Sequence, residues 1–344
     1  MKNQIIQLPA EWYPQSAVQL TWPHENTDWA PILDEVIPCF VAIAKEISKR
    51  ENLLIVCKDE NEVRNQLGAD VDFSRVIFRE VVTNDTWARD HGGISVYVDG
   101  RPTVYNFVFN GWGMKFAAAY DNLITGKLFR SGVFAEDVWR VDMQPFVLEG
   151  GSIESDGKGT LMTTTECLCS VNRNEYLTKE ELECRLKEMF GVKRVLWIEN
   201  GYLSGDDTDS HVDTLARFCS EQTIAYVKCS EQDDEHYVAL SKMEHELQSF
   251  RQANGEPYQL VPLPMADEVE WNGERLPATY ANFLIMNKAV LLPFYGTEKD
   301  EVARALLQNV FPDREVVGIN CLPLIKQHGS LHCVTMQYPE GFII

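Results

Sequence analysis

Short β-type runs alternate with helical segments along the whole chain, and this alternation constrains the fold more than any other feature. Apolar residues recur with helical periodicity at 31–50, 178–191, 233–252 and 298–310. Between these stretches lie runs rich in β-branched and aromatic residues, such as NLLIVC, KRVLWIE and IAYVKC. Strands that alternate with helices predict an α/β fold. Because no Pro-, Gly- or Ser-rich linker divides the chain, we expect a single domain over residues 1–344.

Five residues of chemically useful types are loosely spaced, and each lies beside a strand-like run. They are separated by 59, 62, 71 and 51 positions and comprise Asp90, Glu149, His211, Asn282 and Cys333. Such spacing favours about five similar units arranged around a centre, each carrying one functional residue inward, although the units share little sequence.

The chain is strongly acidic, with 52 Asp and Glu residues against 31 Lys and Arg and a formal charge of −21. A nucleic acid or an anionic membrane would be repelled by this charge, whereas a small cation would be attracted. No apolar stretch approaches the roughly 18 to 20 residues of a membrane span, and the N-terminal residues lack the apolar run of a secretory signal. We therefore expect a cytoplasmic protein. The oligomeric state stays open, with a homo-oligomer as one alternative.

Nine cysteines form no regular disulfide framework, which is typical of reduced and mostly buried thiols. Cys333, in QHGSLHCVTMQ, differs from the others because it follows a glycine-containing turn and opens a β-type run. A thiolate attacks carbon, and its pKa falls beside a cation, so a cationic substrate could itself activate the sulfur. We predict that Cys333 is a nucleophile and that the other eight cysteines are packing residues. A Cys167→Ser substitution is accordingly expected to be catalytically quiet.

A histidine and an aspartate two positions apart form the second candidate group. In SGDDTDSHVDTLARF, His211 and Asp213 would point to the same side of an extended segment. An imidazole suits a general acid that protonates a leaving amine and a base that then activates water. The alternative is a divalent-cation site that includes Asp206, Asp207 and Asp209, but the glycine and terminal glutamate of an EF-hand loop are missing.

Asp90, in TWARD, would supply a second carboxylate beside that of Asp213. A guanidinium is a planar fork of five N–H donors, and two carboxylates gripping its opposite edges are its natural clamp. Taken alone, Asp90 could instead pair with Arg89 or cap a loop. Glu149, which precedes two glycines, could orient His211 through a hydrogen bond.

Two tryptophans, Trp87 and Trp112, could cover an aliphatic or cationic chain with their ring faces, and ordinary core packing is the alternative. Neither the CLC run at 167–169 nor the histidines before Cys333 have the spacing of a structural zinc site. A P-loop and a G-x-G-x-x-G motif are both absent. We therefore expect no metal and no nucleotide cofactor.

Taken in order, these motifs resemble the agmatine deiminase family, which includes the bacterial-type peptidylarginine deiminases and belongs to the guanidine-modifying pentein superfamily. The resemblance covers nearly the whole chain and is carried by LPAEWYPQSAVQLTWP, NDTWARDHGG, FNGWGMKF, LEGGSI, TDSHVDTLARF, LPATYANFLIMN and HGSLHCVTMQ. It implies a five-bladed, pseudo-symmetric α/β propeller with the active site on its central axis. Two stretches depart from the glycine-rich pattern of many members and place Ser210, His328 and Ser330 near the motifs.

The resemblance also implies a reaction, the hydrolysis of agmatine to N-carbamoylputrescine and ammonia through a thiouronium intermediate, without a metal or organic cofactor. The roles that it implies are those of nucleophile for Cys333, acid and base for His211, guanidinium clamps for Asp90 and Asp213, support of the histidine for Glu149, and a pocket wall for Trp87.

Three alternatives to agmatine hydrolysis stay open. Deimination of peptidyl or free arginine would require a cationic pocket residue for the substrate carboxylate, and only Arg89 and Lys115 flank the motifs. A cysteine amidase would act on a neutral amide, which paired carboxylates disfavour. A catalytically silent binding protein could keep the same fold. The acidic residues Asp206, Asp207 and Asp209 are candidates for holding a distal amine.

Overall fold

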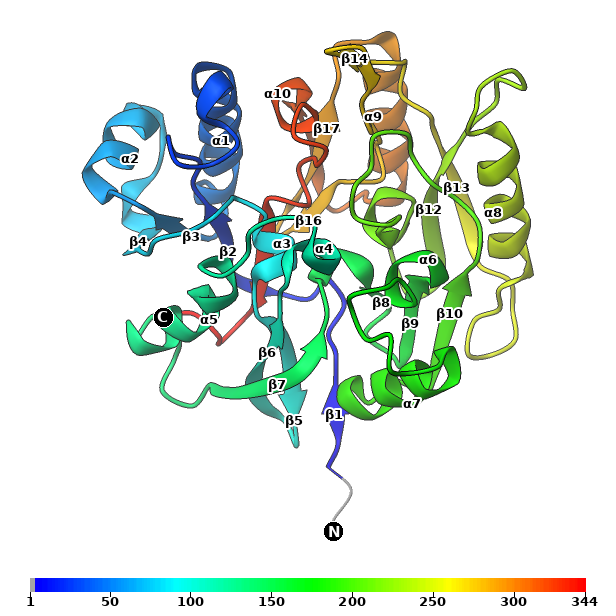
Figure 1. Ribbon diagram of the computed structural model, residues 1–344, viewed down its shortest axis with the longest axis horizontal. Coiled ribbons are helices and arrows are strands. Elements are labelled where there is room, and N and C mark those ends of the chain that lie inside the picture. The colour runs from blue at the N-terminus through cyan, green and yellow to red at the C-terminus, as the bar shows by residue number, and fades with distance from the viewer. Residues whose placement is uncertain (1–3) are drawn as a thin grey trace.

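The computed structural model describes residues 4–344, and within them the strands form five small mixed sheets and one two-stranded hairpin (Figure 1). None of these sheets closes on itself in the described part of the chain. All five are built alike: an antiparallel strand pair is followed by a helical connection and by a strand parallel to the second strand of the pair. The pair is a hairpin in four sheets, and in the fifth it joins the last strand of the chain to one near the N-terminus. This mixed helix and strand order confirms the predicted α/β class.

The strands occur in the following chain order, and most of them are short. They are β1 (Ile6–Gln7), β2 (Gln15–Thr21), β3 (Asn52–Cys57), β4 (Val76–Glu80), β5 (Ile94–Val98), β6 (Arg101–Val108), β7 (Trp139–Val147), β8 (Glu154–Ser155), β9 (Thr160–Thr164), β10 (Arg194–Ile198), β11 (Ala216–Phe218), β12 (Thr223–Lys228), β13 (Gln259–Pro264), β14 (Glu270–Trp271), β15 (Glu274–Arg275), β16 (Leu284–Met286), β17 (Ala289–Phe294), β18 (Glu315–Asn320) and β19 (Thr335–Pro339). The five sheets have the orders β19-β2-β3-β4, β1-β5-β6-β7, β10-β9-β8, β11-β12-β13 and β16-β17-β18.

Most of the α-helices lie in the connections between an antiparallel strand pair and the parallel strand that follows it. They are α1 (Leu33–Ser48), α2 (Glu60–Leu67), α3 (Ala88–His91), α4 (Gly111–Met114), α5 (Ile124–Arg130), α6 (Thr165–Leu168), α7 (Lys179–Phe190), α8 (Tyr237–Ser249), α9 (Glu298–Val310) and α10 (Leu322–Ile325). The four helices predicted from periodicity are confirmed as α1, α7, α8 and α9. None of the helices in residues 4–344 has the length and apolar character needed to cross a bilayer.

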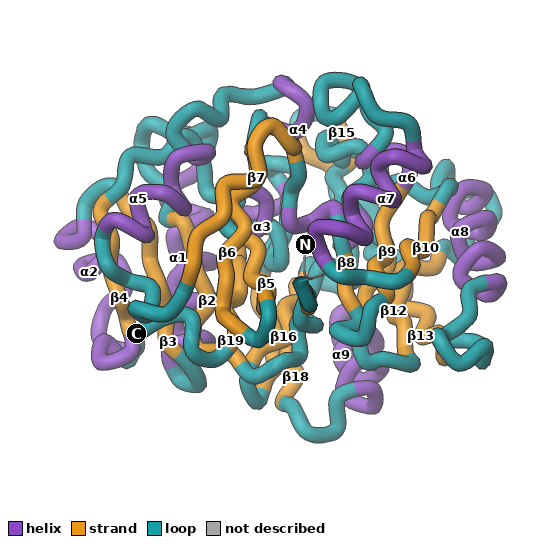
Figure 2. The backbone as a smooth tube through the Cα atoms, turned by 90° about the horizontal axis from the view of Figure 1, so that it is seen from below, coloured by secondary structure: helices purple, strands orange, loops and turns teal. Residues whose placement is uncertain are grey.

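Local sequence explains where the long helices begin and which face they bury. Helix α7 begins after Thr178, whose hydroxyl accepts from the backbone N–H of Glu181 while the Glu181 carboxylate accepts from the backbone N–H of Thr178. Two orphan donors are satisfied in this capping box. Gly191 ends the helix in the left-handed conformation that glycine adopts without strain. Helices α2 and α8 lie at opposite outer edges of the molecule when it is seen from below (Figure 2).

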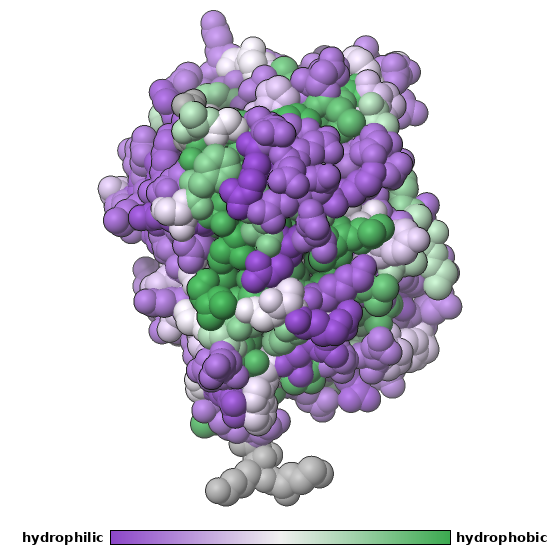
Figure 3. Space-filling model, turned by 90° about the vertical axis from the view of Figure 1, so that its left-hand side faces the viewer, coloured by the Kyte–Doolittle hydropathy of each residue, from purple (hydrophilic) through white to green (hydrophobic). Residues whose placement is uncertain are grey.

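The first sheet joins the two ends of the described chain. Strand β19 pairs antiparallel with β2, and β2 pairs in parallel with β3, so the last strand completes the sheet that the first strands begin. Strand β3 is almost entirely buried, and α1 covers this sheet with an apolar stripe that includes Val36, Phe40, Ile43 and Ile47. On the side of the molecule where α2 and α5 lie, polar side chains cover much of the surface and apolar ones are recessed between them (Figure 3).

The segment just before each antiparallel pair occupies an equivalent place in every unit, and the five spaced residues all lie there. Asp90 precedes β5, Glu149 precedes β8, His211 precedes β11, Asn282 precedes β16 and Cys333 precedes β19. Among these segments, the 3-10 turn at 150–152 contacts both α3 and the 3-10 turn at 212–214. A repeated architecture therefore accounts for the loose spacing of about five functional positions.

Candidate active site

Four of the seven residues predicted for the site line one cavity of about 420 Å³. They are Trp87, Asp90, Trp112 and Cys333. The other three, Glu149, His211 and Asp213, are buried and do not line it. We call this space the front cavity.

Gly151 is the point at which three of the predicted side chains meet. A Cβ atom added to Gly151 would lie 2.6 Å from His211 Nδ1, 2.9 Å from Asp90 Oδ1 and 3.1 Å from Asp213 Oδ2. Real Cβ atoms essentially never approach other heavy atoms this closely, so only glycine fits. The histidine Nδ1 and the Asp90 Oδ1 are themselves 3.7 Å apart. The structure thus brings Asp90 together with His211 and Asp213, which lie more than a hundred positions away in the sequence.

Asp90 is held by two neutral donors. Trp112 donates its indole N–H to Oδ2 at 2.9 Å, and the backbone N–H of Gly151 donates to Oδ1 at 3.0 Å. Burial raises the pKa of Asp90 to about 6, because the positive charge of His211 only partly offsets it and the negative charge of Asp213 adds to it. Trp112 therefore does more than form a wall, since it also fixes one carboxylate.

Asp213, in contrast, is held by a basic side chain. His332 Nδ1 lies 2.7 Å from Oδ2, whereas Oδ1 is buried without a hydrogen-bond partner. Burial favours the neutral acid, but the hydrogen bond and the charge of His332 outweigh burial, and the pKa of Asp213 is lowered. One oxygen of an ionised carboxylate is therefore free to accept a hydrogen bond from a ligand.

His211 is buried, and neither ring nitrogen has a hydrogen-bond partner within residues 4–344. Burial disfavours its charged form, but the negative charge of Asp90, followed by the neighbouring Cys167 and then by Glu149, raises the pKa of the imidazole well above its usual value. A buried polar group without a partner is costly and needs a reason. An imidazolium with free N–H groups is suited to give a proton to a bound molecule.

Glu149 does not form the hydrogen bond to His211 that the sequence predicted. No such bond exists among the described residues, and both Glu149 oxygens instead accept from Arg173 Nε, at 3.0 and 3.1 Å. Both side chains are fully buried, so the charge of Glu149 requires this partner. Sequence reasoning missed Arg173, although the run VNRNEY offers the cation that a buried carboxylate demands.

Cys167 is buried in a hydrophobic cluster, as the sequence predicted, but it also lies next to the candidate site. One acceptor or sulfur atom from each of Glu149, Cys167 and His211 lies within 4.8 Å of the others, and all three side chains are buried. The thiol therefore forms part of the surroundings of the imidazole.

Asn282 positions the segment that carries the nucleophile. Its Oδ1 accepts from the backbone N–H of His332 at 2.9 Å and from the Cys333 thiol at 3.4 Å, and its Nδ2 donates to the Asp213 carbonyl at 3.3 Å. Burial, followed by the negative charges of Asp213 and Asp90, raises the pKa of Cys333 well above its usual value. The thiol is therefore neutral when no cation is bound beside it.

The remaining walls of the front cavity carry acidic groups and no Lys or Arg side chain. Asp85 and Asp207 both line it, and burial raises the pKa of each carboxyl to about 6. The two other candidates for the distal amine are engaged elsewhere. Asp206 accepts from Thr208 and the Ser210 backbone. Asp209 pairs with basic side chains, those of Lys115 and Arg173.

Of the three residues that depart from the glycine-rich pattern, only His328 lines the front cavity. Its Nδ1 lies 2.7 Å from the carbonyl oxygen of Gly205. Ser210 donates to Glu166, and Ser330 contacts the Tyr295 hydroxyl, so both point away from the cavity. His328 is therefore the departure that shapes this space.

Two buried groups bring together the atom types that metals prefer, namely Glu149 with Cys167 and His211, and Glu11 with Glu154 and His332. In each group an arginine already occupies the place of a cation. Arg173 donates to Glu149, and Arg217 donates to both Glu11 and Glu154. The carboxylates are thus neutralised by protein cations, which fits an ion-pair network better than a metal centre.

The front cavity therefore offers a neutral thiol and the Asp90 carboxylate, and the buried His211 imidazole and Asp213 carboxylate lie beside Asp90 at Gly151. Asp213 Oδ1 has no partner within residues 4–344, and a planar cation with several N–H donors would supply one. This arrangement can bind a guanidinium, attack its carbon and protonate a leaving nitrogen.

Comparison with known proteins agrees with this geometry. Residues 7–339 match the family model described as Porphyromonas-type peptidyl-arginine deiminase. A Vibrio parahaemolyticus protein, provisionally named an agmatine deiminase, is 33% identical over 96% of each chain.

Two solved structures are similar in both fold and sequence. A Porphyromonas gingivalis protein, provisionally named an arginine deiminase, is 55% identical, with a TM-score of 0.95 over 98% of this chain and 100% of that one. A cysteine-to-serine variant of the C. jejuni agmatine deiminase with substrate bound is 37% identical, with a TM-score of 0.92 over 99% and 98% of the two chains.

Proposed function

Since the chain belongs to the Porphyromonas-type peptidyl-arginine deiminase family, we propose that it hydrolyses the guanidinium group of agmatine to N-carbamoylputrescine and ammonia. The observation that carries this proposal is the front cavity, in which Asp90 and Cys333 share a lining without any Lys or Arg side chain. Such a lining accepts a substrate with a cation at each end.

Substrate binding would complete the hydrogen bonding of the site. The guanidinium would bridge Asp90 and the free Oδ1 of Asp213, and Trp87 would cover its aliphatic chain. The two carboxylates are the charges that hold the thiol of Cys333 neutral. A bound cation offsets them, so the substrate itself promotes formation of the thiolate.

The chemistry would proceed in two halves, with proton transfers through His211. The Cys333 thiolate attacks the central guanidinium carbon and forms a C–S bond, and one C–N bond breaks as ammonia leaves with a proton from His211. The neutral imidazole then takes a proton from water. The resulting hydroxide attacks the thiouronium carbon. The C–S bond then breaks as the O–H proton of the adduct passes to the sulfur, replacing the proton that the thiol gave to solvent at the start, so the product leaves and Cys333 returns to its neutral thiol.

The charge of the lining also favours agmatine over free or peptidyl arginine as the substrate. The amine end of agmatine would lie near Asp207 and Asp85, the acidic residues of the remaining wall. The carboxylate of free arginine would be repelled there, because Lys115 is engaged by Asp209 and Arg89 does not line the front cavity. The provisional names of the relatives differ on this point, so the charge of the lining is what favours agmatine.

The finer description of the fold belongs to the same proposal. The five sheets with a common pattern of antiparallel pair, helix and parallel strand would be the blades of a five-bladed α/β propeller. The range 1–344 would then form a single catalytic domain. The free state of all nine cysteines fits a reducing compartment and supports the cytoplasm as the location.

Ammonia release from agmatine, free arginine and a C-terminal arginyl peptide tests the proposal. We expect turnover of agmatine only, together with a substrate-dependent mass adduct on Cys333 in rapidly quenched samples. If agmatine is inert and the peptide is deiminated, the assignment is wrong. Hydrolysis of a neutral amide instead would favour the cysteine amidase, which the two buried carboxylates oppose.

A further inference from the structure

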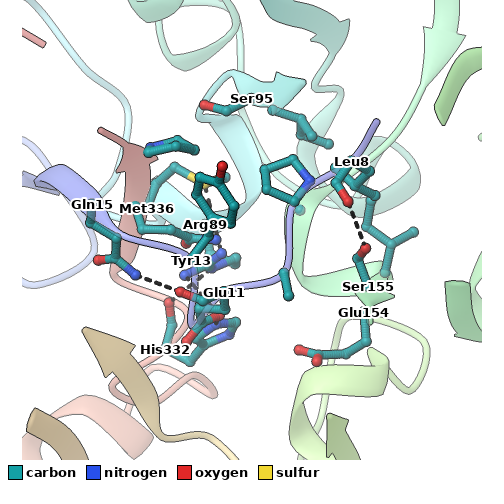
Figure 4. Close-up of a pocket in the computed structure, with 17 residues that line it drawn as sticks. Leu8, Glu11, Tyr13, Gln15, Arg89, Ser95, Glu154, Ser155, His332 and Met336 are labelled. Atoms are coloured by element: carbon teal, nitrogen blue, oxygen red, sulfur yellow. Dashed lines mark hydrogen bonds and ion pairs between the residues drawn. The ribbon is translucent and has the colours of Figure 1, made fainter. Parts of the chain in front are cut away.

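A second cavity, of about 650 Å³, lies against the same wall as the front cavity and is lined by other residues. We call it the rear cavity (Figure 4). Arg89 and His332 line it, and each directly precedes a residue of the front cavity, Asp90 or Cys333. Neighbouring residues of the chain, Arg89 with Asp90 and His332 with Cys333, therefore face the two cavities.

The ring of His332 crosses this wall and joins two carboxylates. Its Nδ1 lies 2.7 Å from Asp213 Oδ2, and its Nε2 lies 2.7 Å from Glu11 Oε2. Carboxylate oxygens accept hydrogen bonds, so the ring is placed to donate from both nitrogens and to act as an imidazolium between the two carboxylates. Arg217 Nη2, 3.1 Å from Nε2, is a second donor to the same Glu11 oxygen, at 2.8 Å.

The surrounding ion pairs place the ring at the centre of a charge cluster. Three acidic residues, Asp213, Glu11 and Glu154, and two basic ones, Arg217 and Arg89, lie around His332 in the wall. Figure 4 shows Glu11 and His332 on one side of the rear cavity and Glu154 across from them. Burial raises the pKa of Glu154, whereas at Glu11 the charges of its neighbours outweigh burial and the pKa is lowered. The ring therefore lies between the two carboxylates that favour the ionised form, those of Glu11 and Asp213.

We propose that Glu11 and His332 are positioning residues for the deimination, and that their ion pair keeps Asp213 ionised with its free oxygen available to the substrate. This inference rests on the proposed function, because it concerns the same carboxylate clamp. Glu11 comes from the LPAEWYP motif, which has no part in the chemistry described above. The motif would thus serve the active site from the rear.

The proposal fixes the direction of a pH effect. The hydrogen bond and charge of His332 lower the pKa of Asp213 against the opposing effect of burial. Without the imidazolium, burial dominates and the Asp213 pKa rises, so the carboxylate protonates at a higher pH. In the wild type Asp90 sets the acid limb of kcat/KM near pH 6. The limb should move to higher pH in variants without the imidazolium because burial, no longer opposed by it, carries the Asp213 pKa above that of Asp90.

Three variants of the full-length chain separate positioning from general stability. Glu11→Gln removes the charge that favours the imidazolium, and His332→Asn removes the ring. Glu154→Gln is the matched control, because Glu154 shares Arg217 with Glu11 but makes no hydrogen bond to His332. We expect the first two to shift the acid limb upward by about one pH unit, roughly a tenfold loss of kcat/KM at acidic pH. Glu154→Gln should lower the melting temperature without shifting the limb.

Equal shifts for Glu11→Gln and Glu154→Gln, or no shift for Glu11→Gln, would overturn the proposal. If the variants fail to fold, a second measurement on the wild-type protein, which requires no turnover, still tests the proposal. In ¹⁵N spectra of the wild-type protein at neutral pH, His332 should show two protonated ring nitrogens, and a neutral ring would contradict the proposal. If wild-type protein leaves agmatine intact, the proposed function fails, while the spectrum still decides the state of His332.

Discussion

The regions around Asp90 and Asp213 solve the same physical problem in opposite ways. Both carboxylates are buried and both border the site of the proposed guanidinium. The groups that donate hydrogen bonds to Asp90 are neutral, the His211 ring lies 3.7 Å away without a hydrogen bond, and the pKa of Asp90 stays raised, at about 6. Asp213 is paired with a basic ring, and its pKa is lowered. The comparison teaches that the charge of the partner, rather than burial alone, decides the state of each carboxylate.

This difference divides the work of binding a cation. Asp213 is a permanent anion, whereas Asp90 changes its charge within a pH range close to neutral. Two permanent buried anions facing each other would be costly in the empty site. The pair therefore keeps its affinity for a cation while limiting repulsion before the cation arrives.

The largest effect should come from Cys333→Ser, which leaves both carboxylates in place. We expect kcat to fall by roughly 10⁴-fold or more, because a serine hydroxyl is a far weaker nucleophile at neutral pH. Agmatine should still bind, as measured by calorimetry, and the inactive variant would then report the clamp alone. Near-normal turnover would refute the covalent mechanism.

Asp213→Asn should have the next largest effect, a loss of about 10³-fold in kcat/KM. Removing one partner of a buried charge pair costs roughly 3–5 kcal/mol, and here it also leaves His332 without its counter-charge. Steady-state kinetics with agmatine measures this effect. A loss no greater than that for Asp90→Asn would break the comparison between the two carboxylates.

Asp90→Asn should cost about 10²-fold in kcat/KM, since its partners are neutral hydrogen-bond donors. The wild-type kcat/KM should fall as the pH drops through about 6, because Asp90 must be ionised to hold the cation. In the Asp90→Asn variant this fall of kcat/KM at acidic pH should disappear. Asp207→Asn is the matched control, since Asp207 also titrates near 6 and its loss should raise KM for agmatine with little change in kcat.

Trp112→Phe should sharpen the comparison with a smaller effect. It removes one neutral donor from Asp90, so the pKa of this carboxyl should rise further and the acid limb should move up by less than about one pH unit. The expected loss of kcat/KM is about tenfold at acidic pH and less above neutrality. A downward shift of the limb would contradict the role assigned to the indole N–H.

Cys167→Ser should give the smallest change, about threefold in kcat, because the thiol borders His211 without a hydrogen bond. This replaces the expectation of a silent substitution. The control is Cys169→Ser, at an exposed cysteine two positions away. Identical kinetics for the two variants would show that the neighbourhood of the imidazole tolerates the exchange.

Sequence reasoning was most successful where a local pattern carries the information. Periodicity located the four long helices, and the chemistry of single residue types located Asp90, His211, Asp213 and Cys333. Helix α2 was missed because its residues are largely polar and its start depends on a single cap, that of Asp59.

Partners in the folded state could not be read from the sequence. Arg173 neutralises Glu149 across 24 positions, and Glu11 reaches His332 across 321 positions. Such pairs are set by the meeting of distant units, which no local pattern records. The choice of Asp207 from a run of acidic residues likewise depends on which side chains the fold engages elsewhere.

The late position of Cys333 in the chain has a consequence for synthesis. The residue lies immediately before β19, which seals the first sheet against β2. A nascent polypeptide could assemble every anionic group of the pocket while still lacking its sulfur. The site would thus become reactive only when the final strand pairs with β2, so an incomplete chain would not expose a reactive thiol.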